Sequence, residues 1–127
     1  MRHTAATLVL LSLCACQPAV APTFDVANVK PSEEPASLTG WYQAADAYRQ
    51  FRLYPKPGDL SVMGKGQCIS GVASSLAGVP PETLNGRKVT ITGPLYAAGA
   101  PDIGDTPDAC AAGAVMIAND IVYADEK

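Results

Sequence analysis

The hydrophobic positions of this 127-residue chain form one continuous apolar run near the start and several short alternating runs later. The first run, residues 4–15, is rich in Ala and Leu and carries no charge. In the second half, Val and Ile alternate with Lys and Thr, which is the period-2 pattern of a strand with one face in water. The pattern therefore predicts an apolar leader followed by a mainly β domain.

The clearest strand prediction covers residues 84–93. Asn85 and Gly86 can adopt the positive φ angles of a tight turn, and Val89 and Ile91 then alternate with polar residues. Three other segments have the composition of short strands, namely 67–73, 114–117 and 121–123.

Two segments allow more than one interpretation. Asn119 and Asp120 predict either a turn between the last two strands or a bulge in one bent strand. Residues 39–53 carry aromatic side chains at spacings that fit a helix as well as a curved strand or hairpin. The aromatic content favours strand, which is our prediction for 39–53.

Residues 84–95, the cysteine-containing strand before them and the strand that ends the chain resemble the small OB-type β-barrels of bacterial envelope proteins. The resemblance covers about 40 residues and is interrupted by the loop after Ala97. It implies a small OB-like barrel or a curled antiparallel sheet. It implies no ligand, because one fold hosts many functions.

The leader begins with the basic end Met1-Arg2-His3 and has the layout of a secretory signal peptide. A spanning helix needs about 20 apolar residues, and Gln17-Pro18 ends this run earlier. We therefore expect the leader to be removed and not to remain as a transmembrane anchor.

The tetrapeptide Leu13-Cys14-Ala15-Cys16 resembles the lipobox of bacterial lipoprotein precursors. The resemblance implies a signal peptide over residues 1–15 and a diacylglyceryl thioether on Cys16, with fatty acyl chains such as palmitate at the new amino terminus. Attachment at Cys14 is the alternative, but it places Leu13 where a small side chain is expected. Secretion without a lipid is a further alternative.

A lipidated Cys16 implies that the membrane is the first partner of this chain. Several acyl chains make membrane attachment effectively permanent. Gln17 stands where an Asp retains many lipoproteins in the inner membrane, so the expected location is the cell envelope, at the outer membrane and facing the periplasm.

Residues 16–37 contain four prolines and little that forms a core, so they predict a tether. The alternation of Phe24, Val26 and Val29 predicts, as an alternative, a short strand inside this segment. The β-rich domain is then expected over residues 38–127, which is enough for one modest core.

Cys68 and Cys110 are the two cysteines that follow Cys16 in the sequence. In an oxidising envelope compartment such a pair usually forms a disulfide, and neither belongs to a Cys-x-x-Cys motif. We predict a structural disulfide that closes a loop of about 43 residues.

The sequence predicts no catalytic residue, metal site or cofactor. The only histidine, His3, lies in the leader, which excludes Ser-His-Asp and Cys-His nucleophile systems and His-bearing zinc sites in the mature chain. Gly64-Lys65-Gly66 lacks the rest of a phosphate-binding loop. Two weaker groupings remain. The first is an acidic loop with Asp102, Asp105 and Asp108, for which Ca²⁺ binding is the lesser alternative. The second is a hydroxyl cluster near Lys65, with Ser70, Ser74 and Ser75.

One group of residues predicts a ligand face, because aromatic rings alternate there with cations. The group comprises Trp41, Tyr48, Arg49, Phe51 and Arg52. The competing interpretation is an ordinary aromatic core with a charged rim. From Cys16 onward the chain carries eight basic and twelve acidic side chains, a net charge of −4, which makes nucleic acid an unlikely partner.

These features predict a lipid-anchored envelope protein that acts by binding or structural contact. The expected partner is another envelope protein, a surface polymer or a small ligand. The alternative is an envelope enzyme that uses carboxylates such as Asp46 or Asp120 without a histidine.

Overall fold

The computed structural model describes residues 21–45, 49–57, 67–74, 77 and 81–124. Within these residues the chain forms six strands: β1 (Ser32–Ala44), β2 (Gln50–Tyr54), β3 (Ile69–Ala73), β4 (Lys88–Ala97), β5 (Ala114–Ala118) and β6 (Asp120–Tyr123). Three short 3-10 helices accompany them: η1 (Val26–Asn28), η4 (Pro81–Leu84) and η5 (Pro101–Ile103). The predicted mainly β fold is confirmed.

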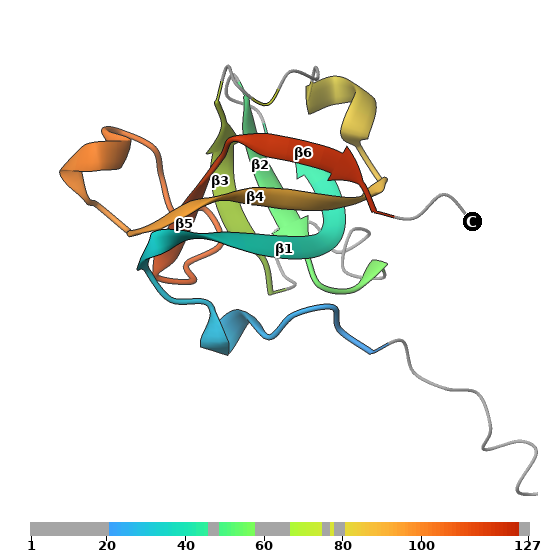
Figure 1. Cartoon of the computed structure of the whole chain (residues 1–127), viewed down its shortest axis with the longest axis horizontal. Helices are drawn as coiled ribbons and strands as arrows, with labels where there is room; N and C mark the ends of the chain where they lie inside the picture. Colours follow the sequence, from blue (N-terminus) through green and yellow to red (C-terminus); the bar gives the residue numbers. More distant parts are fainter. Residues whose placement is uncertain (1–20, 46–48, 58–66, 75–76, 78–80, 125–127) are drawn as a thin grey trace, which may run out of the picture.

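Five of the strands close into a barrel (Figure 1). β1 pairs with β2 and β2 with β3, both antiparallel, and β3 pairs with β5 in parallel. β4 pairs antiparallel with β5 on one side and with β1 on the other, which completes the ring. This arrangement is a small OB-like barrel, as the resemblance implied.

β1 is the strand that closes the ring, because it changes partner along its length. Trp41 pairs with Lys88 of β4 and also with Tyr54 of β2. Gly40 precedes it, and a Cβ atom on Gly40 would lie 2.5 Å from the carbonyl oxygen of Tyr54. Only glycine allows so close an approach, so Gly40 sets the point where β1 passes from one partner to the other. Residues 39–53 therefore contribute to two strands, as predicted, although residues 46–48 lie outside the described part.

β5 and β6 follow the same edge of β4 and are separated by Asn119. Leu95 of β4 pairs with Met116 of β5, and Thr92 of β4 pairs with Asp120 of β6. The two pairs are three residues apart on β4 but four residues apart on the β5–β6 side, so that side has one extra residue. The N–H of Asn119 donates to the carbonyl oxygen of Thr92 at 2.8 Å. Of the two predicted alternatives, the structure shows the bulge in one bent strand.

Alternate side chains of the strands fill the barrel. On β4 the buried positions are Val89, Ile91, Gly93 and Leu95, with half-buried residues between them. The interior contains a stacked aromatic pair, Tyr42 of β1 and Phe51 of β2, with ring centroids 5.1 Å apart. The period-2 pattern in the sequence is thus the inside–outside alternation of a barrel wall.

The predicted disulfide between Cys68 and Cys110 is present, with Cα atoms 5.4 Å apart. It attaches the β4–β5 loop, residues 98–113, to the start of β3. A second contact lies beside it, because the hydroxyl of Ser70 donates to a carboxylate oxygen of Asp108 at 3.4 Å. Ser70 is buried although its side chain is on the outer side of the barrel wall, opposite to Phe51 and Gly71, which face inward.

Residues 21–29 pack on the barrel, and we call this segment the strap. The N–H of Thr23 donates to the carbonyl oxygen of Pro55 at 2.9 Å, and its hydroxyl donates to the carbonyl oxygen of Thr39. Phe24 and Val29 pack against the core. Figure 1 shows the strap in blue below β1.

The strap and β1 correct the predicted tether over residues 16–37. β1 begins at Ser32, inside that segment, and the strap contains η1 in place of the alternative short strand. The prediction took the prolines as evidence against a strand. Pro35 nevertheless lies in the first half of β1, where the pairing with β4 is irregular between Ser32 and Ala36. A strand tolerates proline at such an irregular position.

Candidate functional site

The residues of the predicted ligand face do not lie on one surface of the barrel. Phe51 lies inside the barrel, is 1% exposed and stacks on Tyr42. Its neighbour Arg52 has the opposite orientation, because successive side chains of a strand alternate. Phe51 is therefore a core residue, which corrects its assignment to the ligand face, and Tyr48 lies outside the described residues.

Arg49 is half-buried and forms hydrogen bonds to the backbone at the end of β3. Its Nε donates to the carbonyl oxygen of Ala73 and one terminal nitrogen donates to that of Ser74, both at 2.5 Å. The residue also has a positive φ of 61°. The planar fork of a guanidinium suits two neighbouring acceptors, so Arg49 fastens the β1–β2 connection to the end of β3.

Trp41 and Arg52 do share the outer side of the barrel wall. Trp41 pairs with Tyr54, and Gln43 pairs with Arg52, so both lie on adjacent strands with the same orientation. Lys88 of β4 adds a cation, because its Nζ lies 5.3 Å from the centroid of the Trp41 ring. We call these four half-exposed residues, Trp41, Gln43, Arg52 and Lys88, the outer patch.

Two polar atoms on the outer side of β2 are buried without a hydrogen-bond partner in the described part of the chain. They are the Nε of Arg52 and the hydroxyl of Tyr54. Buried polar groups usually find a partner, and an unpaired one costs about 1–3 kcal/mol. The outer side of β2, next to Trp41, thus carries hydrogen-bonding capacity that the described structure does not use.

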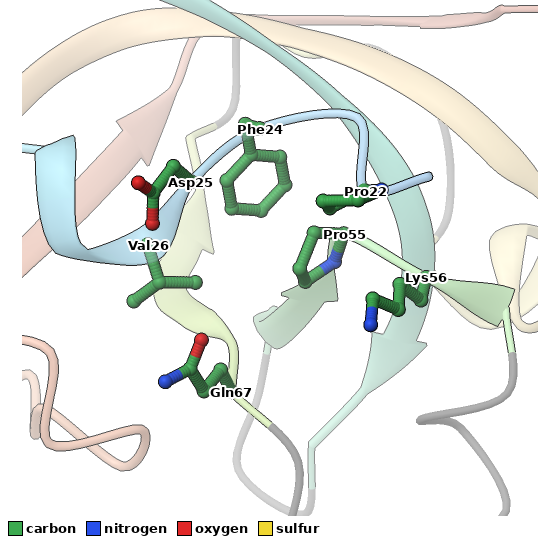
Figure 2. A pocket seen from close by; sticks show the side chains of 7 residues that line it. All are labelled: Pro22, Phe24, Asp25, Val26, Pro55, Lys56 and Gln67. Carbon is green, nitrogen blue, oxygen red and sulfur yellow. The ribbon is translucent and has the colours of Figure 1, made fainter. Parts of the chain in front are cut away.

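A pocket of about 430 Å³ lies between the strap and the ends of β2 and β3 (Figure 2). Phe24 and Val26 of the strap and Pro55 supply apolar walls, and Lys56 and Gln67 supply polar ends. Asp25 also borders the pocket, but its carboxylate accepts from the N–H of Ala27 and the side-chain amide of Asn28, both at 3.1 Å. Its main task is thus to cap η1.

The acidic residues of the β4–β5 loop do not converge. Asp102 and Asp105 are exposed. Asp108 instead accepts the N–H groups of Ala112 and Gly113, at 3.1 and 2.7 Å, in addition to the Ser70 hydroxyl. Among the described residues, no group of three or more His, Cys, Asp or Glu side chains is placed to hold a metal ion.

The hydroxyl cluster is also divided. Ser70 contacts Asp108, whereas the hydroxyl of Ser74 donates to the side-chain carbonyl of Asn119 at 2.8 Å. Ser75 and Lys65 lie outside the described residues, as do Asp46 and Cys16. Asp120 is exposed on β6, opposite Thr92.

Sequence reasoning missed Lys88 and the strap. The sequence predicts Lys88 only as a polar position in an alternating strand. Its approach to Trp41 depends on the pairing of β1 with β4, which the sequence does not show. Phe24 is predicted only as part of an alternative short strand, and nothing in the proline-rich sequence around Thr23 indicates its hydrogen bonds to the barrel. The glycine at position 40, which leaves room for Phe24, was the available signal.

No protein-family model matches this chain, and no curated protein matches its sequence. In the residues that the structure describes, there is no helix with the length and apolar character needed to cross a bilayer.

Proposed function

We propose that this protein is anchored by lipid at Cys16 in a bacterial cell envelope and acts by contact, with the outer patch as the contact surface. The resemblance to the lipobox supports the anchor, because Leu13, Ala15 and Cys16 have the expected residue types in order. Cys68 and Cys110 form a disulfide, and disulfides persist in oxidising compartments such as the bacterial periplasm.

The observation that carries the contact role is the Trp41–Lys88 pair next to Arg52. A half-exposed aromatic ring with one cation over it, Lys88, and a second, Arg52, on the adjacent strand is typical of a surface that recognises an anionic or π-rich partner. The chain is acidic overall, so these cations are a local feature and not part of a general basic field. A surface polymer with carboxylate or phosphate groups, or an acidic region of another envelope protein, is the proposed partner.

Crosslinking in intact cells tests this proposal. A photoreactive amino acid in place of Gln43, between Trp41 and Arg52, should capture the partner. The matched control carries the same group at Asp102, which is exposed on the β4–β5 loop. The double substitution Trp41→Ala and Arg52→Ala, monitored for folding by near-UV circular dichroism, should abolish capture from position 43. Equal capture from positions 43 and 102, or capture that survives the double substitution, would exclude the outer patch.

A further inference from the structure

The strap fixes the place where the anchoring segment joins the barrel. Thr23 hydrogen bonds to two separate segments, through the carbonyl oxygens of Thr39 in β1 and of Pro55, the residue after β2. Phe24 follows it and packs over Gly40. The segment that leads to Cys16 therefore leaves the barrel at the end of β2, on the same side as Lys56 and Gln67 (Figure 2).

The remaining free length is short. Seven residue steps separate Cys16 from Thr23. A chain of seven residue steps spans at most about 25 Å. The full segment 16–37, which the sequence suggested as a tether, would have reached roughly three times as far at full extension.

This length is less than the size of the domain. A compact domain of about 90 residues has a diameter of about 30 Å. If Cys16 lies at the bilayer surface, Thr23 stays within about 25 Å of that surface. An inverted barrel would need Thr23 about one domain diameter from the surface, which is farther than this chain reaches. Figure 1 shows η4 and the strap at opposite ends of the barrel, so the η4 end stays away from the bilayer.

We infer that the strap end of the barrel, with Pro22, Lys56 and Gln67, faces the lipid headgroup layer, and that the strap acts as a spacer that holds this orientation. The inference rests on the proposed lipid at Cys16. The outer patch lies along the side of the barrel, since Arg52 is four residues from Lys56, or about 13 Å of extended chain, and two residues from Gln50.

The orientation is measurable with a fluorophore at two positions of the lipidated, full-length mature protein. Lys56→Cys is exposed at the strap end, and Gln50→Cys is at the far end of β2, about 20 Å away along the strand. Both variants are reconstituted into phosphatidylethanolamine–phosphatidylglycerol vesicles that carry a short-range quencher in the headgroup layer. The vesicles are then recovered by flotation.

We expect a large loss of fluorescence at position 56 and a small loss at position 50. Adding Phe24→Ala should release the strap, lengthen the tether and make the two losses similar. Ala27→Ser, an exposed change in the same segment, should leave the difference intact. Equal quenching at both positions of the unsubstituted strap, in protein that floats with the vesicles, overturns the orientation but not the anchor. Failure to float in the absence of detergent overturns both.

Discussion

Phe24 of the strap lies directly over Gly40 of β1: a Cβ atom on Gly40 would be 3.1 Å from Cε1 of the Phe24 ring. Two segments that look unrelated in sequence, the strap and a barrel strand, are thus fitted to each other. The fit fixes the point at which the segment from the proposed anchor joins the fold.

Loss of the Phe24 ring should loosen the strap. Phe24→Ala removes a half-buried aromatic side chain, and we expect a loss of about 1–3 kcal/mol in the free energy of unfolding. Limited proteolysis should then cut within residues 21–31, whereas the exposed control Ala27→Ser should stay resistant there. Resistance of the Phe24→Ala protein would mean that the strap is not held by this contact.

The disulfide should contribute strongly to stability. Closing the loop between Cys68 and Cys110, 42 residues apart, removes chain entropy from the unfolded state that is worth about 4 kcal/mol. Urea unfolding of the oxidised protein and of the double substitution Cys68→Ala and Cys110→Ala measures this difference. The same midpoint for both proteins would show that the β4–β5 loop is held by Asp108 and Ser70 without the covalent bond.

Two neighbouring arginines should behave differently. Arg49→Lys breaks a fork that serves two carbonyl oxygens, so we expect a loss of about 1.5–3 kcal/mol in stability. Arg52→Lys keeps the charge of the outer patch, and surface changes of this kind usually stay within about 0.5 kcal/mol. Thermal unfolding compares them. Equal effects would contradict the division of Arg49 and Arg52 into a structural and a contact residue.

Tyr54 offers a separate test of the outer side of β2. Its hydroxyl is buried without a partner in the described part of the chain, so Tyr54→Phe should leave stability unchanged or raise it by about 1 kcal/mol. Tyr96→Phe, on β4, is the matched control for removal of a half-exposed hydroxyl. A clear destabilisation by Tyr54→Phe would reveal a hydrogen bond that the described residues do not supply.

Much of the barrel could be predicted from the sequence, because its signals are local. Val89 and Ile91 alternate with polar residues, and the Asn85-Gly86 turn precedes them. With Cys16 predicted to carry the lipid, Cys68 and Cys110 could pair only with each other. The OB-like resemblance predicted a small barrel or a curled antiparallel sheet, and in the structure the parallel pairing of β3 with β5 is part of the closed barrel.

The remaining features could not be predicted, because they depend on which strands become neighbours. Phe51 and Arg52 are adjacent in sequence but lie on opposite sides of the wall, and the register of β2 decides which one faces the core. Lys88 reaches Trp41 only because β1 pairs with β4 in the register that places these two residues opposite each other. A composition rich in proline cannot show that Thr23 will find acceptors on β1 and on the residue that follows β2.

The central claim is that Cys16 is the lipidated amino terminus of the mature protein. Intact mass and fragmentation spectra of the protein extracted from membranes test it most directly. The account predicts a chain that starts at Cys16 and carries a diacylglyceryl thioether, with an acyl group on the amine. A chain that keeps residues 1–15, or one with an unmodified Cys16, would contradict it.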